Sequence, residues 1–297
     1  MSVKNLFASI PPLNIKHDYP LAALTTLGTG GSAEFFAQPE SVSQLQELVK
    51  SARDISVYVL GGGSNIIIPD GTIHGLVISI RSLKSLTWKN KNTAEVEAGY
   101  SLPLLVKTLR DKALGGLEFS AGIPGTLGGA VSGNAGAGGH GVCEFADEVR
   151  GVDSSGGLIT FRRGEFDYGY RHCSLSGVII TSALMTFRDA LPDDGQVLAD
   201  FTAKRKSQPL EFRSAGCTFK NPEGYSAGRL LDECGCKNLS VGDAVVSEKH
   251  ANFILNRGHA KSSDIIGLAE LCAEKVYKCT GIKLEQEIKT LSPCFYV

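Results

Sequence analysis

Residues 121–139 read AGIPGTLGGAVSGNAGAGG, and eight of these nineteen residues are glycine. An average protein contains about 7% glycine, and glycine inside a regular element costs about 1 kcal/mol relative to alanine. Missing side chains instead let backbone amides approach an anion or a flat ring. A flexible linker is the alternative, but Ile123, Leu127 and Val131 recur at four-residue spacing, which linkers lack. We therefore expect a ligand-contacting loop followed by a tight helix.

A second glycine-rich segment, residues 61–65, lies between two short apolar runs. Residues 57–60 are typical of a buried strand, and the β-branched run 66–68 is closed by a Pro-Asp-Gly turn at 69–71. The dinucleotide-binding fingerprint would need a helix here, and a P-loop would need Gly-Lys-Ser/Thr. Successive amides of a strand-to-strand loop can still bind a diphosphate. We interpret this segment as a phosphate loop, with a plain tight turn as the alternative.

The chain has 297 residues, of which 42% are hydrophobic and 21% charged, and its net charge is -1. These values are typical of a soluble globular protein with two or three domains, and they argue against nucleic-acid or membrane partners. No apolar run approaches the ~20 residues of a membrane span, and no secretory signal is visible, so we expect a cytoplasmic protein. The eight cysteines lack zinc-ligand spacing, so we expect reduced thiols and no metal site.

Periodic and alternating apolar positions predict a mixture of helices and strands. Ser41 and Gln44 form the pattern of a capping box at the start of a helix. Residues 1–24 are expected to be irregular, and a composition change at 191–195 indicates a domain boundary. We interpret the basic run Lys204-Arg205-Lys206 as a solvated helix face, although an anion site is the alternative.

Several short motifs follow one another from residue 25 to residue 288. They are Thr26-Leu27-Gly28-x-Gly30-Gly31, Gly61-Gly62-Gly63-Ser64-Asn65, Ala121-Gly122-Ile123-Pro124-Gly125-x-x-Gly128-Gly129, Gly133-Asn134-Ala135-Gly136, Tyr170-Arg171, Ala215-Gly216-Cys217-x-Phe219-Lys220-Asn221-Pro222, His250-Ala251-Asn252-Phe253 and Leu284-Glu285-x-Glu287. In this order they resemble the UDP-N-acetylenolpyruvoylglucosamine reductase (UDP-N-acetylmuramate dehydrogenase) family, flavoenzymes of bacterial cell-wall precursor synthesis. One such motif is modest support; the ordered set is specific and covers nearly the whole chain.

The resemblance implies an α+β fold of the vanillyl-alcohol-oxidase (PCMH) type. Its FAD-binding part would comprise two subdomains, residues 1–86 and 87–195, and residues 196–297 would form an α+β substrate-binding domain. The implied cofactor is non-covalent FAD, with NADPH as co-substrate and no metal. The expected FAD contacts are Gly61, Gly62, Gly63, Ser64, Asn65, Gly122, Ile123, Pro124, Gly125, Gly128, Gly133 and Asn134.

In the reaction that the resemblance implies, NADPH reduces the flavin and leaves, and the enolpyruvyl ether of UDP-N-acetylglucosamine takes its place. Hydride passes from flavin N5 to C3, building charge at C2 and on the carboxylate. Arg171, a permanent bidentate cation, would stabilise this charge, and Glu287 would assist as an acid or by orienting a water. Alternatively, Arg171 pairs with an acidic neighbour and Glu287 is a surface charge. The expected substrate contacts are Tyr170, Lys220, Asn221 and Lys237.

Position 217 departs from many family members, which carry a serine that protonates C2. A thiol, with a reference pKa of ~8.5, can donate a proton at neutral pH, so we assign this role to Cys217, with sensitivity to oxidation as a consequence. A small buried hydrophobe is the alternative. Residues 172–177 leave no room for the tyrosine-bearing loop of longer members. The chain therefore resembles the short subtype, in which the substrate must be covered in another way.

Two other functions fit part of this pattern. A flavin oxidase of the same superfamily would use oxygen, and many such oxidases attach FAD through a histidine near the phosphate loop. No histidine stands at 61–68, and His74 lies beyond the next turn. A nucleotide-binding regulator without catalysis would not need Arg171, Cys217 and Glu287 together. We expect an enzyme with small-molecule partners. Its oligomeric state stays open, with a monomer favoured, as does its preference for NADPH over NADH.

Overall fold

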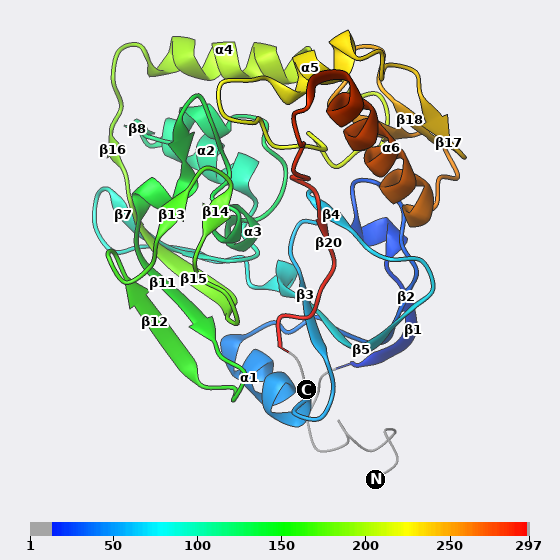
Figure 1. Ribbon diagram of the computed structural model, residues 1–297. Helices are drawn as coiled ribbons and strands as arrows, with labels where there is room; N and C mark the ends of the chain where they lie inside the picture. Colours follow the sequence, from blue (N-terminus) through cyan, green and yellow to red (C-terminus); the bar gives the residue numbers. More distant parts are fainter. Residues whose placement is uncertain (1–13, 296–297) are drawn as a thin grey trace.

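The computed structural model describes residues 14–295 and combines helices with β-sheets, so the expected α+β class is confirmed (Figure 1). The α-helices are α1 (Val42–Ser51), α2 (Leu102–Asp111), α3 (Leu127–Ser132), α4 (Asp194–Lys206), α5 (Ala227–Glu233) and α6 (Ser262–Thr280). Short 3-10 helices lie at Ala22–Leu24, Ile80–Ser82, Glu118–Ser120 and Val142–Phe145. In the described part of the chain, no helix is both long and apolar enough to cross a membrane.

The first sheet has the strand order β1-β2-β5-β3, in which β2, β5 and β3 run parallel and β1 pairs antiparallel at one edge. Its strands are β1 (Lys16–Pro20), β2 (Ser32–Ala37), β3 (Val57–Leu60) and β5 (Thr72–Ser79). Helix α1 connects β2 to β3 and buries Leu45, Leu48 and Val49. Its N-cap is Ser41, as predicted, but the Gln44 side chain accepts from the amide of Glu40 and so leaves the capping box incomplete.

The prediction that residues 1–24 are irregular is wrong for β1; residues 1–13 lie outside the described part. Strand β1 reads KHDYP and is mostly exposed, so it carries no alternation of apolar residues. Its pairing comes from the backbone of β2, with Lys16 opposite Phe36 and Tyr19 opposite Ala33. An edge strand of this kind has a polar sequence that periodicity does not detect.

The second sheet is antiparallel throughout, with the strand order β12-β11-β15-β7-β6. Phe35 and Leu76 of the first sheet, Leu48 of α1, and Val149 and Ala183 of the second sheet belong to one hydrophobic core, so the two sheets fold as neighbours around α1 (Figure 1). The strands are β6 (Leu86–Trp88), β7 (Thr93–Glu97), β11 (Ala146–Val152), β12 (Leu158–Arg162) and β15 (Ile179–Thr186).

The C-terminal third builds its own core around α6, which buries Ile265, Leu268 and Val276 and ends at Gly281 in the left-handed conformation (φ 74°). Leu27 and Ile67 from the first part of the chain complete this core. A three-stranded sheet packs on α6; its strands are β17 (Ser240–Val241), β18 (Ala244–Val246) and β19 (Ile254–Asn256).

The chain then returns to the first sheet. Strand β20 (Lys289–Thr290) pairs in parallel with β4 (Ile66–Ile67), Leu291 enters the core of the first sheet, and the Val57 amide reaches the Phe295 carbonyl. Figure 1 shows this segment crossing the middle of the molecule. The expected domain limits stay predictions, and the last residues of the third expected domain pack on the first.

The remaining strands form two-stranded pairs: β8 (Leu114–Gly115) with β16 (Arg188–Asp189), β9 (Gly136–Ala137) with β10 (His140–Gly141), and β13 (Tyr168–Gly169) with β14 (His172–Cys173).

Candidate active site

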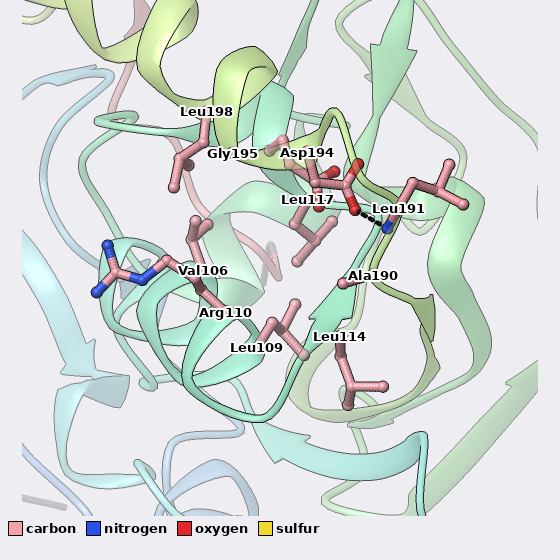
Figure 2. A pocket seen from close by; sticks show the side chains of 11 residues that line it. Val106, Leu109, Arg110, Leu114, Leu117, Ala190, Leu191, Asp194, Gly195 and Leu198 are labelled. Atoms are coloured by element: carbon pink, nitrogen blue, oxygen red, sulfur yellow. Dashed lines mark hydrogen bonds between the residues drawn. The ribbon is translucent and has the colours of Figure 1, made fainter.

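A cavity of about 900 Å³ is lined by residues from all three parts of the chain. Its walls include both glycine-rich segments, the tip of the β13–β14 hairpin, the end of α4, residues 210 and 212–217, and the C-terminal segment around β20. A second cavity, of about 130 Å³, lies between α2 and the start of α4 and contains none of the predicted site residues (Figure 2). The large cavity is therefore the candidate site.

The two glycine-rich segments pack directly against each other in the wall of this cavity. A Cβ atom on Gly62 would lie 2.5 Å from the Cα atom of Gly125, and one on Gly125 would lie 2.8 Å from Ser64 Oγ. The Ser64 hydroxyl donates to the carbonyl of Pro124 at 3.0 Å. The segment 121–139 is thus an ordered loop followed by α3, in which Leu127 and Val131 are buried, and the linker interpretation is wrong.

The loop at 61–65 is held through hydrogen bonds to its carbonyl groups. The half-buried guanidinium of Arg81 donates to the carbonyls of Gly61 and Gly62 at 2.9 Å each, and to that of Leu24 at 2.6 Å. The amide of Thr26 donates to the carbonyl of Gly63. The amides of residues 62–65 donate to no acceptor within residues 14–295. Free amides in succession are a binding surface for an anion.

Arg171, Cys217 and Glu287 come together from three separate segments of the chain. Arg171 lies in the two-residue turn between β13 and β14, with φ +56°, and its Nε pairs with Glu287 Oε1. The Glu287 amide donates to the carbonyl of Thr218, next to Cys217, at 2.8 Å. The Glu287 side chain is only 15% exposed, so it is no surface charge. Arg171 does pair with an acidic neighbour, but that neighbour is the other predicted catalytic residue.

The thiol of Cys217 is half-buried beside this ion pair. Burial, reinforced by the Glu287 carboxylate, raises the pKa of Cys217 to about 11. The reference acidity assumed from the sequence therefore does not hold, and the thiol stays protonated at neutral pH. A protonated thiol next to an arginine and a carboxylate can deliver a proton to an atom in the cavity.

Comparisons with known proteins agree with this geometry. The family model of an FAD binding domain matches residues 33–162, and that of the UDP-N-acetylenolpyruvoylglucosamine reductase C-terminal domain matches residues 208–291. The reductase of Geobacter metallireducens is 42% identical over 280 residues, which cover 93% of each chain. That of Clostridioides difficile is 36% identical over 97% of this chain and 96% of its own. The chain belongs to the UDP-N-acetylenolpyruvoylglucosamine reductase family. It is an FAD-dependent oxidoreductase.

Solved structures confirm the expected fold. The crystal structure of the UDP-N-acetylenolpyruvylglucosamine reductase from Thermus caldophilus superposes with a TM-score of 0.81 at 33% identity, covering 94% of this chain and 99% of its own. Phl p 4.0202, a glucose dehydrogenase, shares only the fold, with a TM-score of 0.51 at 19% identity over 64% of this chain and 44% of its own. The reductase architecture thus holds over nearly the whole chain.

The residues present suit FAD in two respects. Besides the free amides of the loop at 61–65, the cavity wall contains Thr126, whose buried Oγ1 has no hydrogen-bond partner among the described residues. An orphaned buried hydroxyl is rare and indicates a missing partner. Of the predicted FAD contacts, Gly122 and Asn134 do not line the cavity, whereas the others do: Gly61, Gly62, Gly63, Ser64, Asn65, Ile123, Pro124, Gly125, Gly128 and Gly133.

The cavity also carries cations that the sequence reasoning placed elsewhere or missed. Lys204, Arg205, Arg213 and Lys289 line it, and none of them forms an ion pair within the described chain. Lys204 and Lys206 are exposed, as a solvated helix face requires, but Arg205 is half-buried and lines the cavity together with Lys204, so the end of α4 faces the cavity. Burial also lowers the pKa of Arg205. No periodic signal marks these residues, since a basic run looks the same on any helix face.

The predicted substrate contacts Tyr170, Lys220, Asn221 and Lys237 do not line the cavity. The Tyr170 hydroxyl accepts from the Asn221 amide at 3.3 Å, which joins the hairpin tip to the C-terminal part. Lys220 pairs with Glu285 and Lys237 with Asp232. Contacts of these four residues with a substrate stay predictions. Within residues 14–295, no cluster of His, Cys, Asp or Glu could hold a metal ion.

Proposed function

We propose that this enzyme reduces UDP-N-acetylglucosamine enolpyruvate to UDP-N-acetylmuramate, with NADPH as the electron donor. The observation that supports this most is the meeting of Arg171, Cys217 and Glu287 at a cavity that also holds the glycine-rich wall. Bound FAD supplies the hydride that C3 of the enolpyruvyl group receives. The glycine loops would hold the cofactor's diphosphate through the free amides of residues 62–65.

The three catalytic residues divide the remaining chemistry. The Arg171 guanidinium would bind the enolpyruvyl carboxylate, where negative charge builds up. Cys217 would deliver its proton to C2, because its raised pKa keeps the thiol protonated. Glu287 would keep Arg171 oriented through their ion pair. The hydride at C3 and the single proton that Cys217 gives to C2 would together complete the saturated lactyl ether.

The unpaired cations explain how one cavity could take two anionic ligands in turn. Lys204, Arg205, Arg213 and Lys289 line the cavity, and within residues 14–295 none of them pairs with a carboxylate. NADPH and the UDP-sugar each carry several phosphate charges, so both would be attracted to the same surface. We propose that NADPH occupies the cavity first and that the UDP-sugar replaces it.

A steady-state assay tests this function. NADPH consumption should depend on added UDP-N-acetylglucosamine enolpyruvate, and mass spectrometry should show a product 2 Da heavier than the substrate, the mass of two hydrogens. NADPH consumption that is independent of this substrate and releases hydrogen peroxide would instead support a flavin oxidase.

A further inference from the structure

The three proposed catalytic residues lie on segments that are irregular or very short. Contacts from other parts of the chain must therefore keep their side chains in place relative to one another. Arg171 sits in the turn of a hairpin whose strands β13 and β14 have two residues each. Cys217 lies outside the named strands and forms an isolated backbone bridge to Phe253, and Glu287 precedes the short strand β20. A short two-stranded hairpin is marginally stable by itself in water.

Each of these segments is held by the side chain of an asparagine from a different part of the chain. We propose that Asn134, Asn252 and Asn65 are positioning residues that keep Arg171, Cys217 and Glu287 together during the reaction. This inference rests on the proposed function for its kinetic consequences, while its structural part can be tested separately.

Asn134 holds the hairpin of Arg171. Its amide group donates to the carbonyl of Gly169 at 2.8 Å, and its Oδ1 accepts from the Cys143 amide at 3.0 Å. The residue is 7% exposed and has φ +42°, a conformation that asparagine and glycine tolerate best. Both ends of the side chain are therefore occupied, and the hairpin is fixed to the end of α3 two residues before Arg171.

Asn252 holds the segment of Cys217. Its Oδ1 accepts from the Phe219 amide at 2.9 Å, and its Nδ2 donates to the Phe219 carbonyl at 2.8 Å, inside the core. Its own carbonyl accepts from the Thr218 amide at 2.8 Å, while the Thr218 carbonyl accepts from the Glu287 amide at 2.8 Å. The Asn252 side chain thus fixes Phe219, two residues after Cys217, and the backbone hydrogen bonds of Thr218 connect this segment to Glu287.

Asn65 connects the third catalytic residue to the glycine loop. Its Nδ2 donates to the Glu287 carbonyl at 3.1 Å, and its carbonyl accepts from the Lys289 amide at 3.2 Å. Because Asn65 also lines the cavity, its replacement would disturb cofactor binding as well. Asn134 and Asn252 are the better test sites.

The variants Asn134→Gly and Asn252→Ala each remove the side-chain hydrogen bonds of one of these asparagines. Glycine at 134 keeps the left-handed backbone, so the side-chain contacts alone are lost. A misplacement of ~1 Å can slow a reaction by about 100-fold. We therefore expect substrate-driven reoxidation of the flavin to slow about 10- to 100-fold, while reduction by NADPH changes less than about twofold. Asn92→Ala is the matched control, since Asn92 Nδ2 donates to the Phe187 carbonyl beside the ends of β7 and β15 and contacts none of these segments through that hydrogen bond.

Two measurements test the positioning role of these asparagines. Stopped-flow spectroscopy follows the two half-reactions, and hydrogen–deuterium exchange follows residues 168–173 and 217–219. Asn134→Gly should speed exchange in the hairpin, Asn252→Ala should speed it around Phe219, and Asn92→Ala should do neither. Equal slowing of both half-reactions, or unchanged exchange, would overturn the proposal. If Asn252→Ala does not fold, Asn252→Asp, which retains an acceptor for the Phe219 amide, must show the same selective defect. A wild-type enzyme that the UDP-sugar does not reoxidise would refute the proposed function. The exchange data would still test whether the asparagine side chains stabilise residues 168–173 and 217–219.

Discussion

Arg81 offers the sharpest perturbation of the proposed cofactor site. Its guanidinium donates to the carbonyls of Gly61, Gly62 and Leu24, and no carboxylate pairs with it in the described residues. Arg81→Met retains an unbranched aliphatic chain but lacks the guanidinium, so all three hydrogen bonds are lost. We expect the loop at 61–65 to lose its fixed conformation, so that FAD must order it on binding.

The magnitude follows from the two loop residues that Arg81 holds. Ordering the backbone of one residue costs about 1–2 kcal/mol, so ordering Gly61 and Gly62 on binding would cost about 2–4 kcal/mol. At about 1.4 kcal/mol per factor of ten, the Kd for FAD should rise roughly 30- to 1,000-fold. Arg81→Lys keeps the charge but loses the planar fork, so its Kd should lie between those of wild type and Arg81→Met.

Titration of FAD into apoprotein, followed by quenching of flavin fluorescence, measures this effect. Arg53→Met, at an exposed arginine beyond α1, is the control and should leave the Kd unchanged. Thermal melts of the apoproteins show whether a variant is folded. A Kd for folded Arg81→Met within about threefold of wild type would refute the reasoning, because less than about 0.7 kcal/mol would then depend on Arg81.

Three further predictions concern the Cys217 thiol, the pH dependence that its pKa implies, and the glycine contact at residue 62. Cys217→Ala should slow substrate-driven reoxidation about 100- to 10,000-fold and leave reduction by NADPH intact. Because the pKa of Cys217 is raised to about 11, loss of its proton should reduce the wild-type rate only as the pH approaches that value; a decline centred near pH 8.5 in stopped-flow data would contradict this. Gly62→Ala should abolish FAD retention on gel filtration, since its Cβ would lie 2.5 Å from Gly125 Cα, whereas Gly267→Ala in α6 has open space and should retain the cofactor.

Much of the fold could be predicted because its signals are local. The apolar periodicity and caps of α1, α2 and α6, and the glycines around residue 62, can be recognised within windows of a few residues. The motif order then identified the family. These signals report which segments form elements and which loops must lie close to another backbone.

The rest depends on contacts between distant residues. Asn65 and Glu287 are 222 positions apart, and Asn134 donates to a carbonyl 35 positions away, so no short stretch of sequence shows that these asparagines bond to the segments of Glu287 and Arg171. Arg205 looked solvated because only the packing of α4 places its side chain in the cavity. Strand β1 was missed because its partner, not its own sequence, defines it. Likewise, the acidity of Cys217 depends on burial that the motif does not encode.

The central claim is that FAD bound in this cavity takes hydride from NADPH and transfers it to an enolpyruvyl UDP-sugar. An anaerobic titration tests it most directly: the purified holoenzyme is reduced with NADPH, UDP-N-acetylglucosamine enolpyruvate is added, and the visible flavin absorbance is followed. We predict a rapid return of the oxidised spectrum in wild type and a slow return in Cys217→Ala. Flavin that stays reduced until oxygen is admitted would contradict the account.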